Sequence, residues 1–169
     1  MSVQRDEKKM WAALDQFFLR VLGEKTGRAV MQESREQAAA FLAAAQEPSP
    51  SRLAVMQSTI LPRTAVYTVL KRRGLDAEKL MEKYIREVQG PVMHDRYAGL
   101  EWIPHFFSIF RWAFRKKTAS SDAWDSVFTA ETDSFDLTIR KCLWHDTCAA
   151  CGCPEACRFF CECDNYSFG

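Results

Sequence analysis

The sequence predicts an α+β fold: a mainly helical N-terminal two-thirds followed by a short antiparallel sheet and a cysteine-bearing C-terminal helix. Two observations support this prediction. Apolar residues recur at three- and four-residue spacing over the first 117 residues, and the period becomes nearly alternate after Ser120. The length of 169 residues fits one domain, 1–169, with a helical part at 1–117 and a hairpin plus cysteine-rich helix at 120–169.

Composition and charge restrict the classes of partner. The chain is 47% hydrophobic and 27% charged with a net charge of +1, so its overall balance favours neither nucleic acid nor a membrane as a partner. No apolar run approaches the roughly 18 residues of a membrane span. Residues 1–9 lack the apolar core of a signal peptide. We expect a cytoplasmic protein that acts on a small molecule. Formation of a homo-oligomer and binding of a partner subunit are both left open by the sequence.

The first helices are predicted from their periodicity and their stops. One buried face near the N-terminus comprises Met10, Trp11, Leu14, Phe17, Phe18, Val21 and Leu22. A second, alanine-rich helix is predicted from Glu33 to Gln46, because Pro48 and Pro50 follow it.

The next two helical regions are each predicted to be interrupted or ended at a proline. Leu53–Ile60 and Arg63–Arg73 are predicted as separate pieces interrupted at Pro62, with Gly74 as the C-terminal stop. Asp76 is the predicted N-cap of the next helix, and Gly90-Pro91 is its predicted end.

The segment 104–117 combines five aromatic residues with a basic end. We interpret it as a core helix with a solvated tip, because aromatic residues occur on nearly every side. A membrane-surface helix, a pocket wall and a subunit contact are the alternatives. After Ser120, the pattern predicts a half-buried strand from Phe135 to Cys142, with Trp124–Thr129 as its hairpin partner. Cys142 departs from strict alternation by one residue, as a strand end or a bulge would.

All seven cysteines lie between Cys142 and Cys163, and three hypotheses explain them. Zinc or an iron–sulfur cluster could be held by a set of ligands consisting of Cys148, Cys151, Cys153 and Cys157. Structural zinc usually needs two separated ligand pairs, however, and only one Cys-x-x-Cys pair is present. A thioredoxin-like redox role needs a surrounding βαβ pattern, which is not visible.

The third hypothesis is a catalytic thiol and carboxylate on one helix. Pro154 suits a first helical position and Glu155 suits the positive end of the helix. In a helix from Pro154 to Asn165, Cys157, Cys161 and Asp164 share a face. Spacing alone does not decide, since a buried cysteine is more often a small inert hydrophobe.

The same segment resembles a known family. Residues 135–146 (FDLTIRKCLWHD), Gly152-Cys-Pro-Glu155 and Phe160-Cys-Glu-Cys-Asp164 are similar to the core signature of the L-2-amino-thiazoline-4-carboxylic acid hydrolase family. The matching positions are Cys142, Gly152, Pro154, Glu155, Cys161 and Asp164. The likeness is strong over 124–168 and looser over 52–88. The chain has more cysteines than the family usually carries, and it stops before the strand-forming tail that members usually have.

The resemblance implies hydrolytic opening of a 2-amino-thiazoline ring, or of a related cyclic amidine, to an N-carbamoyl-cysteine without a cofactor. In one route Asp164 or Glu155, with His145 as a group that titrates near neutrality, activates water. In the other, a thiolate of Cys161, or else Cys142, attacks the ring carbon.

Arg140 and Arg158 are the candidate anchors for a substrate carboxylate. Two alternatives to the hydrolase stay open: a non-enzymatic zinc or iron–sulfur module, and an interaction subunit with reduced catalysis.

Overall fold

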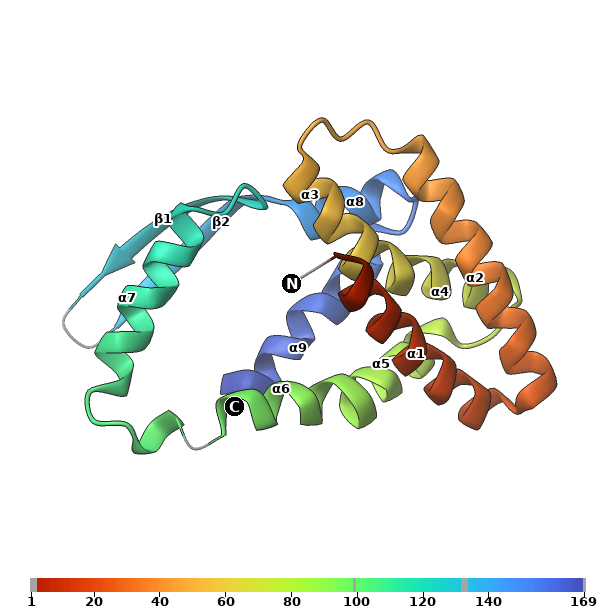
Figure 1. Ribbon diagram of the computed structural model, residues 1–169, viewed down its shortest axis with the longest axis horizontal. Coiled ribbons are helices and arrows are strands. Elements are labelled where there is room, and N and C mark those ends of the chain that lie inside the picture. The colour runs from red at the N-terminus through yellow and green to blue at the C-terminus, as the bar shows by residue number, and fades with distance from the viewer. Residues whose placement is uncertain (1–2, 99, 132–133, 169) are drawn as a thin grey trace.

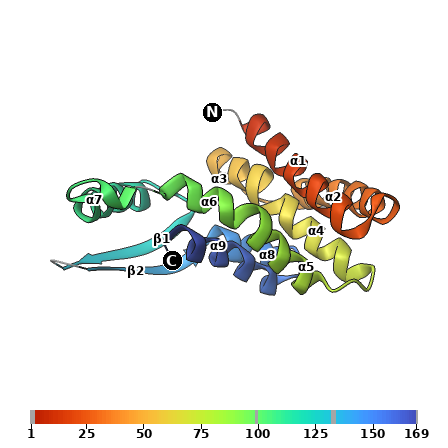
Figure 2. The ribbon, with the colours of Figure 1, turned by 90° about the horizontal axis from the view of Figure 1, so that it is seen from below.

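The computed structural model describes residues 3–98, 100–131 and 134–168. Residues 1–2 of the N-terminal segment and residues 132–133 of the hairpin turn lie outside this part. The chain forms a helical body and a projecting arm (Figure 1). The arm consists of one helix lying over a two-stranded hairpin, as the view from below shows (Figure 2). The predicted α+β class is confirmed.

The body begins with two antiparallel helices, α1 (Val3–Leu22) and α2 (Glu24–Ala44), joined at Gly23 with a positive φ of 78°. The second helix starts nine residues before the predicted Glu33. Gly27 does not interrupt it, because its missing side chain lets the two backbones touch. A Cβ at Gly27 would lie 2.8 Å from both Leu19 Cα and Phe18 O.

Two long helices, each containing a π-helical turn, follow. The first comprises α3 (Pro50–Val55), η1 (Met56–Ile60) and α4 (Leu61–Arg72). The second comprises α5 (Ala77–Tyr84), η2 (Ile85–Gln89) and α6 (Gly90–Tyr97). Gly74 lies at the predicted stop with φ 69°. Asp76 is the N-cap and accepts a hydrogen bond from the Lys79 N–H at 3.1 Å.

The predicted breaks at Pro62 and Gly90-Pro91 are wrong, because both helices continue through them. Proline lacks an N–H, and its ring clashes with the carbonyl four residues before it in a regular α-helix. The wider π turn that precedes each proline avoids this clash. The Leu61 N–H accordingly bonds to Met56 O, and the Gly90 N–H bonds to Ile85 O.

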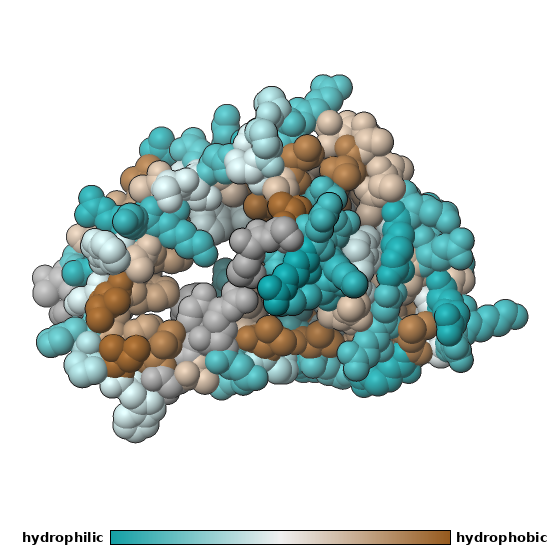
Figure 3. All heavy atoms as spheres, in the orientation of Figure 1, coloured by the Kyte–Doolittle hydropathy of each residue, from teal (hydrophilic) through white to brown (hydrophobic). Residues whose placement is uncertain are grey.

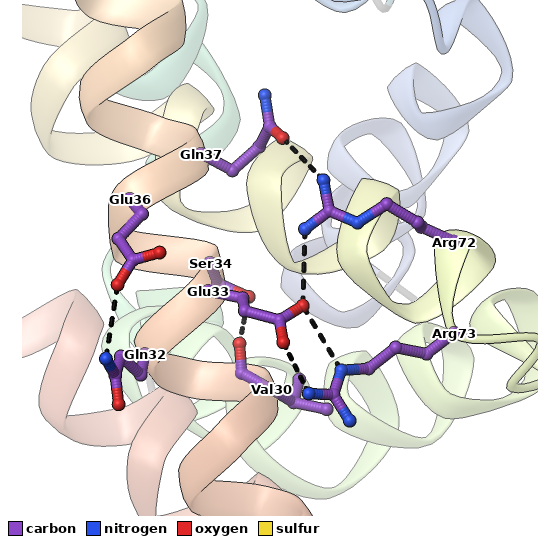
Figure 4. A network of polar contacts seen from close by, with 8 residues as sticks. All are labelled: Val30, Gln32, Glu33, Ser34, Glu36, Gln37, Arg72 and Arg73. Atoms are coloured by element: carbon purple, nitrogen blue, oxygen red, sulfur yellow. Dashed lines mark hydrogen bonds and ion pairs between the residues drawn. The ribbon is translucent and has the colours of Figure 1, made fainter.

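Aromatic side chains unite the helices of the body. The Phe17 ring lies 5.3 Å from Tyr84, and Tyr67 lies 5.6 Å from Phe159. All four rings are at most 1% exposed. At the surface, Glu33 of α2 accepts hydrogen bonds from Arg72 and Arg73 at the end of α4 (Figure 4). The core is therefore shared between the N-terminal helices and the cysteine-rich end.

The C-terminal part consists of a hairpin and three short helical segments: β1 (Trp124–Ala130), β2 (Phe135–Cys142), α8 (Leu143–Ala150), η4 (Pro154–Cys157) and α9 (Arg158–Phe168). The strands pair antiparallel, as predicted, with a bulge that leaves Arg140 without a partner residue. The predicted helix from Pro154 to Asn165 begins as a 3₁₀ turn and becomes α-helical at Arg158.

The arm helix departs from its predicted core position. In α7 (Phe106–Ala119), which follows the short turn η3 (Leu100–Trp102), Thr118 is the buried residue. Phe110 and Phe114 contact Phe135 on the hairpin. The hairpin covers one side only, so Ile109 and Trp112 stay 53% and 65% exposed. Apolar surface is visible on the arm in Figure 3.

Within the described residues, no helix combines the length and the apolar character that crossing a bilayer requires.

The α1–α2 contact at Gly27 predicts an unusual response to substitution. Gly27→Ala should lower the free energy of unfolding by about 1–3 kcal/mol, because the added Cβ overpacks a backbone contact. Helix propensity alone would change it by about 1 kcal/mol in the opposite direction. Urea denaturation measures the difference, and Ala40→Gly at an exposed position of α2 calibrates the propensity effect. A Gly27→Ala protein more stable than the wild type would refute the close contact.

Candidate functional site

The hairpin bulge determines where Cys142 lies. Trp124 pairs with Cys142 across the strands, and Phe128 pairs with Leu137. Because β2 has one extra residue at Arg140, Cys142 returns to the face that carries Phe135 and Leu137. The half-buried Cys142 therefore faces the helical side of the sheet at the point where β2 enters α8.

Helix α9 and the turn before it bring a second set of groups to Cys142. Cys161 and Asp164 lie three residues apart on α9 and share a face, and Cys157 lies four residues before Cys161 and interacts with it electrostatically. Cys142 and Asp164 both lie close enough to Cys161 to raise its pKa. We call Cys142, Cys157, Cys161 and Asp164 the thiol–carboxylate cluster.

Burial is the main cause of the pKa shifts within this cluster. It is the main reason that the pKa of Cys161 is raised, and it raises the pKa of Cys157 to about 12. Burial also raises the pKa of the Asp164 carboxyl, although the residue as a whole is exposed. The thiols of Cys157 and Cys161 therefore stay protonated at neutral pH, and Asp164 becomes a stronger base than an ordinary aspartate.

Two other cysteines are buried in the core of the body. Cys148 and Cys153 are 0% and 3% exposed, and their sulfurs lie 3.6 Å from the hydroxyl oxygens of Thr64 and Thr68. Burial raises the pKa of Cys148 to about 11 and that of Cys151 to about 12. All seven cysteines are free thiols. In the described part of the chain, no three His, Cys, Asp or Glu side chains are arranged to hold a metal ion.

The remaining predicted residues lie apart from the cluster or are paired elsewhere. Glu155 bonds to Lys71 at 2.6 Å and accepts from the Tyr67 hydroxyl at 3.3 Å. The bond to Lys71 is the main reason that the pKa of Glu155 is lowered. His145 is exposed, with Nδ1 3.5 Å from its neighbour Asp146.

The two arginines predicted to bind a substrate carboxylate lie in different surroundings. Arg158 pairs with Glu78 and Glu82 at 3.2 and 2.8 Å, so its charge is compensated by the body's own carboxylates. Arg140 is exposed at the bulge.

A buried arginine that the sequence patterns did not single out lies between the two π turns. Arg63 is 6% exposed, and its Nε donates to Thr59 O of η1 at 3.2 Å. Its Nη1 donates to Gln89 Oε1 of η2 at 2.7 Å. Gln89 Oε1 also accepts from the Cys163 thiol at 3.2 Å. The available signal was a proline inside each of two helical patterns, since π turns are frequent at functional sites.

A shallow groove of about 330 Å³ lies elsewhere, between α1, α2 and η1. Its lining includes Trp11, Arg35 and Gln57 and no cysteine. The cation of Arg35 there pairs with Asp15 and stacks on Trp11 at 4.9 Å. These groups satisfy one another, so the groove contributes nothing to the chemistry of the cluster.

The burial differences predict an order of thiol reactivity. In the native protein at pH 8, iodoacetamide should label exposed Cys161 first, and buried Cys148, Cys153 and Cys163 should react only after unfolding. Cys161 should react more slowly than in the urea-unfolded chain, because its raised pKa limits the thiolate. Peptide mass spectrometry over time measures this order. Equal labelling of Cys148 and Cys161 in native protein would contradict it.

Comparison with known proteins gives one match. The family model of L-2-amino-thiazoline-4-carboxylic acid hydrolase matches residues 53–168. No curated protein and no solved structure matches the chain. The matched range includes both π turns, the hairpin and the thiol–carboxylate cluster, so it joins the strong and the loose parts of the resemblance in the sequence. The chain belongs to the L-2-amino-thiazoline-4-carboxylic acid hydrolase family.

Proposed function

We propose that the chain hydrolyses L-2-amino-thiazoline-4-carboxylate, or a related cyclic amidine, to N-carbamoyl-L-cysteine or its analogue. The observation that carries the proposal is the position of Asp164. Its partly desolvated carboxyl lies one helical turn from Cys161 and within the part of the chain that matches the family. A carboxyl with a raised pKa next to proton-bearing thiols is suited to moving protons during hydrolysis.

The reaction consumes one water molecule. Water adds to the ring carbon between nitrogen and sulfur, which is electrophilic when the amidine is protonated, and Asp164 takes one proton from that water. The carbon then carries a hydroxyl group. As the bond from this carbon to the ring sulfur breaks, the hydroxyl loses its proton to solvent and becomes the carbonyl oxygen of a urea on the cysteine nitrogen. The sulfur accepts a proton and leaves as a thiol, and the proton held by Asp164 restores the group that donated it. Water is the only co-reactant, so the proposal includes no metal or cofactor.

The electrostatics favour direct attack by water over attack by a cysteine. A useful thiolate needs a nearby cation or a helix N-terminus to lower its pKa. Burial is the main cause that raises the pKa of Cys161, and the negative charge of Asp164 acts in the same direction. We therefore assign Asp164 as the general base. Cys161, as a thiol, is the proposed proton donor to the leaving sulfur.

Glu155 and His145 have no step in this proposal. The Glu155 carboxylate is already paired with Lys71, and a lowered pKa makes it a weaker base than Asp164. His145 is exposed beside Asp146. Cys142 is assigned a supporting position, since it flanks Cys161 where the hairpin joins the body.

An interaction subunit with reduced catalysis is the second candidate, and the arm is the observation that favours it. Trp102 and Trp112 are 84% and 65% exposed, and Ile109 is 53% exposed. Ile109 and Trp112 lie three residues apart on α7 and share a face. Exposed apolar patches often mark protein contacts. A chain that self-associates through the arm and turns over no cyclic amidine would fit this second candidate.

Asp164→Asn should lower kcat/KM at least about 100-fold, since general-base catalysis typically contributes 10²–10⁴-fold. Production of N-carbamoyl-cysteine measures it, and Glu162→Gln on the same helix is the matched control. In the wild type the activity should fall as the pH drops through the raised pKa of Asp164, because only the carboxylate accepts a proton. Full turnover by a folded Asp164→Asn protein would refute the assignment.

Cys161→Ser distinguishes the two routes. If water attacks directly, a hydroxyl can replace the thiol as a weaker proton donor, and the variant should keep measurable turnover. If Cys161 were the nucleophile, this variant would be inactive, and a covalent adduct would accumulate on the wild type during single turnover. Rapid-quench intact-mass spectrometry measures the adduct. A wild-type protein that gains the mass of the opened ring would overturn the water route.

A further inference from the structure

We propose that Arg63 binds the carboxylate of the ligand and that the two π turns form its anion site. The identity of the ligand rests on the proposed function, but the site itself does not. Every exposed cation considered as an anchor from the sequence lies on β2 or α9. Arg63 instead comes from α4, in the interior of the body, one residue after Pro62.

The charge of Arg63 has no carboxylate partner. It forms no ion pair within the described residues, whereas Arg158, Arg72 and Arg73 each pair with glutamates. The acceptors that surround Arg63 are neutral: a backbone carbonyl, the Gln89 amide and the Cys163 thiol. A buried unpaired charge destabilises a protein by several kcal/mol. Such an arrangement is typical of a site that a ligand of opposite charge completes.

Part of the guanidinium is available to a ligand. Nε and Nη1 make hydrogen bonds, but Nη2 makes none. Within the described residues, Arg52 Nε is the one buried side-chain nitrogen or oxygen without a hydrogen bond. Nη2 is therefore not fully buried. A carboxylate can approach there.

The guanidinium is held in place before any ligand binds. Thr59 O and Gln89 Oε1 fix its edge from the two π turns, and the Phe160 ring covers its face at 4.0 Å from Cζ. A planar guanidinium held in this way matches the geometry of a carboxylate, and little side-chain entropy is lost on binding. Phe160, which covers Arg63, and Asp164 lie four residues apart on α9 and share a face of that helix. An anchored carboxylate would therefore hold the ring on the side of α9 that carries Asp164.

The test combines binding with kinetics. Three probes are compared: L-2-amino-thiazoline-4-carboxylate, L-thiazolidine-4-carboxylate as an unreactive carboxylate, and 2-amino-thiazoline without a carboxylate. Arg63→Met removes the charge with a similar length, Arg63→Lys keeps the charge without the planar fork, and Arg72→Met is the control on the same helix. Arg63→Met removes a buried charge that has no ion-pair partner, so no uncompensated charge is left behind and the variant should fold. Circular dichroism checks this.

We expect both carboxylates to raise the Tm of the wild type and of Arg72→Met but not of Arg63→Met. Arg63→Met should raise the KM for the carboxylated substrate about 10- to 100-fold, the range of a charged hydrogen bond. It should leave turnover of 2-amino-thiazoline unchanged, because that probe has no group for Arg63 to bind. Arg63→Lys should fall between them, which a purely structural role of Arg63 would not produce.

The outcomes separate the two proposals. If the unreactive carboxylate stabilises the wild type but not Arg63→Met, and no probe is turned over, the anion site stands and the proposed hydrolysis fails. If Arg63→Met binds the carboxylates as well as the wild type, the anion site is refuted. An equal loss of turnover for the carboxylated and uncarboxylated substrates in Arg63→Met would also refute it, because the variant would then act without regard to the carboxylate.

Discussion

The missing N–H groups of Pro62 and Pro91 shape the interior of the body. Each proline lies inside a long helix, and each helix accommodates it with a wider turn immediately before it. These turns place Thr59 and Gln89 around the side chain of Arg63. A regular α-helix would not tolerate either proline without a kink. The position of the buried Arg63 guanidinium thus depends on Pro62 and Pro91, which cannot donate a backbone hydrogen bond.

The cysteine-rich end depends on this interior. Cys148 and Cys153 pack on Thr64 and Thr68, which follow Arg63 along α4. Helix α9 packs beside α6, where a Cβ on Gly90 would lie 2.8 Å from the Tyr166 ring. These contacts fix the end of the chain against the two long helices. The crowded cysteines therefore include buried members that serve packing, while Cys161 and Asp164 remain near the surface.

The arm has a different physical basis. Phe135 stacks on Phe128 and packs against Phe110 and Phe114, and this small aromatic cluster joins the helix to the hairpin. The cluster is separate from the core of the body, and the other side of α7 stays exposed (Figure 1). The same strand that anchors the arm ends in Cys142. Any partner that moved the arm would therefore act on a strand that leads into the thiol–carboxylate cluster.

Local patterns were sufficient for much of the fold. The period of the apolar residues predicted the helices and the hairpin, and Asp76 and Gly74 marked a cap and a stop. The one-residue offset of Cys142 left a strand end or a bulge as the two explanations, and the structure has the bulge. These features depend on neighbours within a few residues, so the sequence by itself determined them. The residues at 135–146, 152–155 and 160–164 were also enough to indicate the family.

Other features were decided only by the tertiary structure. The helices continue through Pro62 and Pro91 because packing outweighs the local cost of a proline, and Gly27 is tolerated because two backbones meet there. The aromatic helix at 106–119 lies in the arm because the hairpin covers one of its sides only. Glu155 is paired with Lys71 from 84 residues away, and Arg63 meets Gln89 across 26 residues. The protonation and pairing of a charged group depend on neighbours that folding brings from distant positions, which local sequence patterns do not contain.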